Sequence, residues 1–207
     1  MKVGKPSAAL YLPERLSLKR LRDAAAGCRG CDLYLHATQT VFGEGTAHAR
    51  MMLVGEQPGD SEDRFGHPFV GPAGNLLRKA MQRAGIAERD VYITNAVKHF
   101  KFVVRGKRRI HVKPKLIELR ACRPWLEAEI KVVKPRVIVA LGASAAQSLL
   151  GPAFRLTAHR GHAVPSPFEA ALFATVHPSA ILRSPDDRSR HAQMEAFVDD
   201  LRAAAAS

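Results

Sequence analysis

The sequence predicts an α/β fold, a three-layer α/β/α sandwich around a central four-stranded parallel sheet. Four apolar, β-rich segments end in glycine or polar residues, and helical segments separate them. The chain has 207 residues, 46% of them hydrophobic, which is enough for a sizeable core. Strands that alternate with helices are typical of a parallel sheet covered on both faces.

The first half of the chain supplies two of the strands. Residues 15–26 form a short basic segment that ends at Gly27, and we expect a helix there. The apolar run 49–56 (ARMMLVGE) leads into a glycine and a carboxylate, as a buried strand that ends in a loop does. Residues 74–86 have apolar side chains at helical spacing, and residues 91–97 (VYITNAV) are rich in β-formers. We therefore expect a helix and then a second strand.

The second half continues the alternation. Residues 114–133 read as a helix with a proline near its start, where proline is tolerated. The run 135–142 (PRVIVALG) predicts a third buried strand, and the helix expected at 143–151 ends at a glycine. A fourth strand running into a loop is expected at 170–179, and a closing helix at 190–206.

Charge and composition indicate the class of partner. The formal net charge is +13 and the isoelectric point is near 10.2, so we expect a polyanion, most commonly nucleic acid. No stretch approaches the ~20 apolar residues of a spanning helix, which argues against a membrane. The N-terminus lacks a continuous apolar region, so we expect a cytoplasmic protein. With neither a linker nor a repeat, residues 1–207 should form a single domain, which we expect to be monomeric.

Polar side chains gather where strands of the predicted sheet end. Ligands of such sheets bind beyond the carboxyl ends of the strands. That rule selects the segment 55–60 (GEQPGD), Asn95, the loop after Gly142, and the segment 177–179 (HPS). Each alone is consistent with a turn or a cap, and Phe69 in the Gly/Pro-rich loop is consistent with a core plug. Together, a carboxylate, an aromatic ring, an amide and an imidazole are what an enzyme acting on a flipped-out base needs.

The motifs GEQPGD, HPFVGPAG, ITNAVK and HPSAILR, in this order, resemble those of the uracil-DNA glycosylase superfamily. The pair Cys28 and Cys31, with ACRPWLEAEI around Cys122, resembles its iron–sulfur branch, and the inserted GKRRIH resembles the UdgX subgroup. The resemblance implies the four-stranded fold already expected. It also implies excision of uracil from DNA, with single-stranded DNA as the preferred substrate, followed by covalent trapping on the sugar C1′. A conventional multiple-turnover glycosylase and a non-catalytic single-strand-binding module are the alternatives.

The resemblance also implies roles for individual residues. Phe69 would stack on the extruded uracil, Asn95 would bond its Watson–Crick edge, and His177 would stabilise charge on the leaving group. His111 would attack C1′, with Glu56 orienting it and accepting its proton. The implied catalytic residues are thus Glu56, Asp60, His111 and His177; the uracil-binding residues are Gly55, Gln57, Phe69 and Asn95; and the DNA-binding residues are Lys107, Arg108, Arg109, Ser179 and Arg183.

The basic segment around His111 has a simpler interpretation. Residues 98–115 contain eight lysines and arginines and no acidic residue. Such a run is usually a solvated or phosphate-binding patch, and the residues alone favour that interpretation. Phosphate binding is expected under either interpretation, and only the resemblance makes His111 a nucleophile.

Three cysteines in a reducing compartment argue against a disulfide framework. By resemblance they would hold a [4Fe–4S] cluster, for which the iron–sulfur glycosylases use four cysteines. His99 stands where those enzymes have the remaining cysteine, and histidine can replace cysteine on iron. The expected ligands are Cys28, Cys31, His99 and Cys122, with a structural role for the cluster. Zinc held by three cysteines and one histidine is the alternative.

Overall fold

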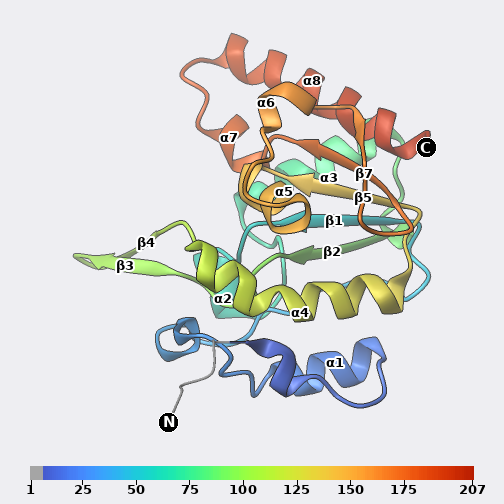
Figure 1. Ribbon diagram of the computed structural model, residues 1–207. Helices are drawn as coiled ribbons and strands as arrows, with labels where there is room; N and C mark the ends of the chain where they lie inside the picture. Colours follow the sequence, from blue (N-terminus) through green and yellow to red (C-terminus); the bar gives the residue numbers. More distant parts are fainter. Residues whose placement is uncertain (1–6) are drawn as a thin grey trace.

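The computed structural model describes residues 7–207 and confirms the predicted α/β/α sandwich (Figure 1). The central sheet has five strands in the order β2–β1–β5–β7–β6. The first four are parallel, as predicted, whereas the two-residue β6 pairs antiparallel with β7 and was not expected. The strands of this sheet are β1 (Met51–Gly55), β2 (Val91–Asn95), β5 (Val137–Leu141), β6 (Ala163–Val164) and β7 (Ala171–Thr175).

Helices cover both faces of the sheet, because successive side chains of each strand point to opposite faces. On one face, Met52 of β1 lies in the same buried cluster as Trp125 of α4. On the other face, Leu53 shares a buried cluster with Phe197 of α8. The helices are α1 (Leu18–Ala25), α2 (Asp60–Phe65), α3 (Pro72–Ala84), α4 (Leu116–Val133), α5 (Ala143–Leu150), α6 (Leu156–His159), α7 (Pro178–Leu182) and α8 (Asp187–Ala205), with 3-10 turns η1 (Ala8–Tyr11), η2 (Asp32–Leu35) and η3 (Glu88–Asp90).

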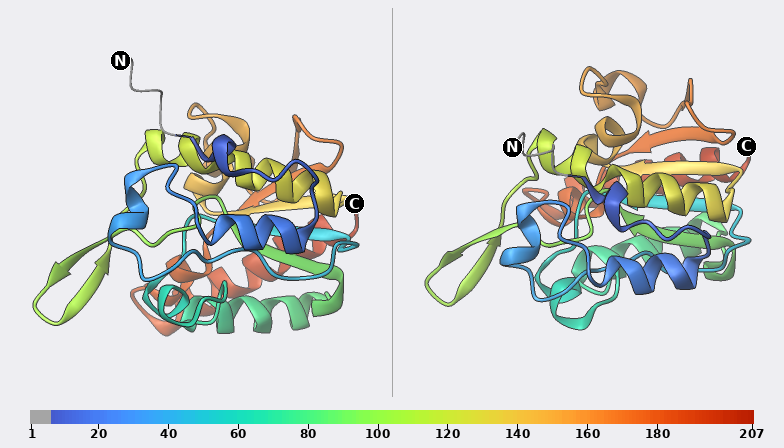
Figure 2. Two further views of the ribbon diagram at one scale, coloured as in Figure 1. Left: turned by 90° about the horizontal axis from the view of Figure 1, so that it is seen from below. Right: turned by 60° about the horizontal axis from the view of Figure 1, so that its bottom comes forward.

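The basic segment that follows β2 forms an antiparallel hairpin. Strands β3 (Phe102–Arg105) and β4 (Arg108–His111) pair Phe102 with His111 and Arg105 with Arg108. Gly106 at the turn has φ +59°, a left-handed conformation that glycine adopts without strain. Figures 1 and 2 show the hairpin projecting from the body of the chain. No secondary structure was expected for this segment, and His111 lies at the base of the hairpin.

Helices α2, α6 and α7 also differ from the sequence-based expectation, and no element was expected where α6 lies. Helix α2 lies inside the stretch expected to be only a loop, and it begins at Asp60. The segment expected as one strand and a loop splits into β7 and the short helix α7, which begins at Pro178 directly after His177. Within residues 7–207, no helix has the length and apolar character needed to cross a lipid bilayer.

Candidate active site

The candidate site lies at the carboxyl ends of β1 and β2, where the two strands are in register; the side chains gathered there are called the pocket below. Gly55 pairs with Asn95 across the parallel ladder. A Cβ placed on Gly55 would lie 2.2 Å from Asn95 Oδ1 and 2.7 Å from Cζ of Phe69, so glycine is required for these groups to approach. Phe69 has φ +56°, which is rare for a bulky residue, and its main chain packs so closely on Gly74 that no side chain fits there. Strained backbone thus presents an aromatic ring to the mouth of the sheet.

Asn95 presents an unused hydrogen-bond acceptor in this pocket. The residue is 2% exposed, and its Oδ1 has no hydrogen-bond partner among residues 7–207. A buried acceptor without a partner costs ~1–3 kcal/mol, so native proteins rarely keep one without a reason. A ligand that donates a hydrogen bond at this point would remove that cost.

His177 completes the pocket as a neutral donor. Its ring lies 5.9 Å from the ring of Phe69, with an angle of 30° between the planes. The main-chain N–H of Ser179 donates to His177 Nδ1 at 3.1 Å, so Nδ1 carries the lone pair and the proton of the neutral ring is on Nε2. Burial lowers the pKa of His177 to about 4, and the charge of Glu56 only partly opposes this effect. The imidazole is therefore neutral at pH 7.

Glu56 and His111 form a pair beside the pocket. His111 Nε2 lies 3.2 Å from Glu56 Oε1. The Glu56 side chain is 19% exposed and that of His111 is 51% exposed. Burial alone would raise the pKa of Glu56, but hydrogen bonds from His111 and Ser144 and the proximity of His177 outweigh it and hold that pKa below its usual value. The carboxylate is therefore ionised at pH 7 and available to accept a proton.

Gln57 fastens the base of the hairpin. Its Nε2 donates to the carbonyls of Lys101 at 3.2 Å and Val112 at 3.1 Å, and its Oε1 accepts from the Lys101 N–H at 3.1 Å. Gln57 was expected among the uracil-binding residues. In the structure both ends of its amide are occupied by main chain on either side of the hairpin, so Gln57 fixes where His111 stands.

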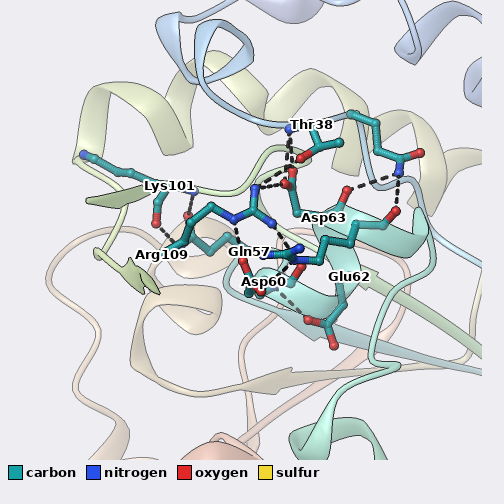
Figure 3. Close-up of polar contacts among 10 residues, drawn as sticks. Thr38, Gln57, Asp60, Glu62, Asp63, Lys101 and Arg109 are labelled. Carbon is teal, nitrogen blue, oxygen red and sulfur yellow. Dashed lines mark hydrogen bonds and ion pairs between the residues drawn. The ribbon is translucent and has the colours of Figure 1, made fainter. Parts of the chain in front are cut away.

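Arg109 fastens the hairpin at a second point (Figure 3). Its Nε lies 2.5 Å from Asp60 Oδ1 and its Nη1 lies 2.6 Å from Asp63 Oδ2. The guanidinium also packs on the rings of Phe100 and Phe102, 5.5 and 5.0 Å from their centroids. Burial would raise the pKa of Asp60, yet its bonds to Arg64 and Arg109 lower it below the usual value.

Arg109 was expected to bind DNA and Asp60 to act in catalysis. The structure pairs the two residues with each other, and their expected roles stay predictions. Asp63 is fully buried and also accepts from the N–H of Thr38. Arg109 with its two carboxylate partners, Asp60 and Asp63, is called the Arg109 clamp below.

Asp63, Thr38 and Ser144 were not expected at the site, because each acts through a partner distant in sequence and no local pattern marks it.

The other expected DNA-binding residues lie on the surface around the site. Lys107 and Arg108 are exposed at the end of the hairpin, and Arg183 is exposed just after α7. Ser179 is half-buried, with its Oγ 2.8 Å from His177 Nδ1. The side chains of Lys107, Arg108 and Arg183 thus present positive charge to solvent, and their expected contact with DNA stays a prediction.

Cys28 and Cys31 lie in the short segment between α1 and η2, and both are near Cys122 of α4. Trp125 Nε1–H donates to Cys28 Sγ at 3.3 Å, and the N–H of Lys98 donates to Cys122 Sγ at the same distance. Burial, with a smaller contribution from the nearby Cys31 and Cys28, raises the pKa of Cys122 to about 12, although the charge and the N–H of Lys98 partly oppose this shift. A metal cation bound to such thiols would instead lower their pKa. Among residues 7–207, no three His, Cys, Asp or Glu side chains already form a group that could hold one metal ion.

His99 is suited to act as a nitrogen ligand. Thr40 Oγ1–H donates to the Ala25 carbonyl at 2.9 Å, so the same oxygen accepts from His99 Nε2–H, also at 2.9 Å. The lone pair of the ring is therefore on Nδ1, and burial lowers the pKa of His99 to about 4, which keeps it neutral. Two buried thiols with N–H donors, the half-buried thiol of Cys31 and a neutral imidazole are a donor set that fits the expected iron–sulfur group.

The chain is similar to a known protein family and to several known proteins. A family model described as the uracil DNA glycosylase superfamily matches residues 42–202. The chain is 36% identical over 187 residues to the type-4 uracil-DNA glycosylase of Thermotoga maritima, covering 90% of this chain and 93% of that protein. It is 36% identical over 177 residues to the type-4 uracil-DNA glycosylase of Pyrobaculum aerophilum, covering 82% and 87%. It is 34% identical over 158 residues to the type-5 uracil-DNA glycosylase of Thermus thermophilus, covering 67% and 68%.

Proposed function

The chain belongs to the uracil-DNA glycosylase superfamily, and we propose that it excises uracil from DNA and then bonds covalently to the exposed sugar through His111. This second step is that of the UdgX subgroup. The observation that carries the proposal is the Glu56–His111 pair held beside a pocket with an unused amide acceptor. The substrate would be single-stranded DNA by preference, because an unpaired base costs less to present. We infer that one copy of the chain suffices.

Recognition of uracil rests on Asn95 and Phe69. An amide can accept a hydrogen bond from uracil N3–H and donate one to O4, whereas cytosine presents the opposite pattern at that edge. Cytosine would therefore leave buried groups unpaired, which disfavours it. The unpartnered Oδ1 of Asn95 supports this assignment, and the ring of Phe69 beside it provides a stacking surface.

Bond cleavage would use His177. As the bond between C1′ and uracil N1 breaks, both electrons leave with the base, and negative charge develops on it. The Nε2–H of neutral His177 can donate to that charge without itself losing a proton. One preorganised donor of this kind is worth ~3 kcal/mol of transition-state stabilisation.

Capture would follow on the cationic sugar. The ring nitrogen of His111 that Glu56 does not hold gives its lone pair to C1′, and a carbon–nitrogen bond forms. The proton on the other ring nitrogen passes to Glu56, so the bound imidazole ends neutral. Gln57 and Arg109 act here by holding the hairpin and hence His111 in place.

The cysteines and His99 would hold a [4Fe–4S] cluster, with zinc as the alternative. The donor chemistry of Cys28, Cys31, His99 and Cys122 supports this assignment. Bound there, the cluster would brace the start of the hairpin segment, which begins directly after His99. A His99→Ala variant that kept iron, stability and DNA coupling would refute the ligand assignment.

A denaturing gel tests the function. Wild-type protein is mixed with a labelled single strand containing one uracil, and with a thymine control. We expect a uracil-dependent band that survives denaturation and disappears in His111→Ala. Free uracil and abasic strand in excess over protein, without such a band, would instead establish a conventional multiple-turnover glycosylase whose basic hairpin only binds phosphate.

A further inference from the structure

A buried charged network lies directly behind Asn95. Lys98 and Glu129 form an ion pair of 2.5 Å, with side chains 1% and 0% exposed. Lys98 Nζ also donates to Thr94 Oγ1 at 2.6 Å and to the main-chain oxygen of Asn95 at 2.8 Å. Glu129 accepts from Tyr92 OH at 2.9 Å and from Thr94 Oγ1 at 3.0 Å. The three N–H donors of the ammonium thus each have a partner.

Such a pair is not explained by stability alone. Removing two charges from water costs about as much as their attraction returns, so apolar residues of similar volume often serve equally well. Networks of this kind can instead specify one arrangement of the groups they contact. What the Lys98 ammonium contacts, besides its counter-ion and Thr94, is the backbone of Asn95.

Asn95 depends on its backbone for its position. Its side-chain Oδ1 has no hydrogen-bond partner within residues 7–207, so that end of the amide has no bond to orient it. β2 is an edge strand of the sheet, and its last residue pairs only with Gly55 of β1. In an internal strand, such a carbonyl would accept from the main chain of a neighbouring strand. In β2, the carbonyl of Asn95 accepts from the Lys98 side chain instead. Lys98 therefore supplies a second point of attachment.

We propose that Lys98, held by Glu129, is a positioning residue for uracil recognition: it fixes the main chain of Asn95 so that the amide faces the base. The proposal rests on the proposed function and extends it to groups that touch neither base nor sugar. The main-chain N–H of Lys98 also donates to Cys122 Sγ. One residue therefore connects the thiol site to the base-reading amide.

Binding of two matched oligonucleotides tests the proposal. One strand carries a 2′-fluorinated deoxyuridine, which resists cleavage, and the other carries a tetrahydrofuran abasic analogue at the same position. We expect Lys98→Met to weaken binding of the uracil strand ~10- to 100-fold, the scale of one or two misplaced hydrogen bonds, and to leave the abasic strand unaffected. In a double-mutant cycle, Lys98→Met should add little once Asn95 is alanine, because the two act through one contact.

Two further variants separate positioning from folding. Tyr92→Phe removes a hydrogen bond to Glu129 but leaves the contact between Lys98 and Asn95; it should lower the unfolding temperature and keep uracil affinity. If Lys98→Met does not fold, Lys98→Met combined with Glu129→Gln removes the orphaned charge and should fold while still losing uracil affinity. A folded Lys98 variant with wild-type uracil affinity, or with a loss fully additive to Asn95→Ala, would overturn the proposal. Wild-type protein that does not prefer uracil over thymine would overturn the proposed function, and this proposal with it.

Discussion

Asp63→Asn should uncouple capture from excision. Asp63 is fully buried and accepts from Arg109 at 2.6 Å and from the Thr38 N–H at 3.0 and 3.1 Å. Asparagine keeps the shape and one acceptor oxygen but removes the charge that pairs with Arg109. A hydrogen bond between charged groups contributes ~1.5–3 kcal/mol. The hairpin bearing Arg109 projects from the body, so we expect the loss to appear as local undocking rather than global unfolding.

Loss of that free energy lowers the equilibrium constant for docking of the hairpin onto the body of the protein about 10- to 150-fold. The rate of adduct formation, followed on denaturing gels under single-turnover conditions, should fall, while release of free uracil persists because Phe69, Asn95 and His177 are untouched. Hydrogen exchange of hairpin amides should accelerate in parallel. Arg108→Met, on an exposed residue that does not enter the clamp, is the control and should leave exchange unchanged. An Asp63→Asn protein with normal adduct rate and normal amide protection would refute the role of the clamp.

Four other changes have expected outcomes. Gln57→Ala frees the hairpin base and should slow adduct formation more than uracil release; equal slowing of both on the same gels would contradict this. The pKa of His177 is lowered from 6.5 to about 4, so its contribution to stability is complete above pH 6.5 and is lost as pH falls towards 4. The unfolding temperature of wild type relative to His177→Gln should therefore be constant above pH 6.5 and fall between pH 6.5 and 4, and a difference independent of pH would contradict this. Cys122→Ala should remove iron and visible absorption and lower the unfolding temperature, whereas stoichiometric zinc in the wild type would favour the alternative metal. Lys107→Ala should weaken binding of all single strands alike and reduce the slope of log affinity against log salt by ~1, and a uracil-specific loss would argue against a phosphate contact.

The sheet and the pocket could be predicted from the sequence because the patterns that mark them lie within short stretches of the chain. Apolar runs that end in Gly55 or Asn95 mark both a strand and its carboxyl end, and the topology of parallel sheets brings those ends together. The expected helices differ from the observed ones by only a few residues at their ends. Helix α7, which begins at Pro178, was not predicted because it is only five residues long.

The hairpin and its contacts with the body of the protein could not be predicted from the sequence in this way. Residues 102–111 are mostly exposed and basic, so the apolar alternation that marks a strand is weak there. Gly106 was the one local signal of the turn. The roles of Gln57 and Arg109 depend on partners more than 40 residues away in the chain, Lys101 and Asp63. No local pattern distinguishes an arginine that binds phosphate from one that binds a buried carboxylate.

The division between sheet and hairpin has a consequence for how such a protein changes over generations. Under the proposed function, Asn95 and His177 at the sheet release the base, whereas His111 on the hairpin decides whether the protein is released afterwards. The hairpin is joined to the rest mainly through Gln57 and the Arg109 clamp. A few substitutions there could turn a reusable catalyst into a single-use marker of damaged DNA, or the reverse, while base selection stays the same.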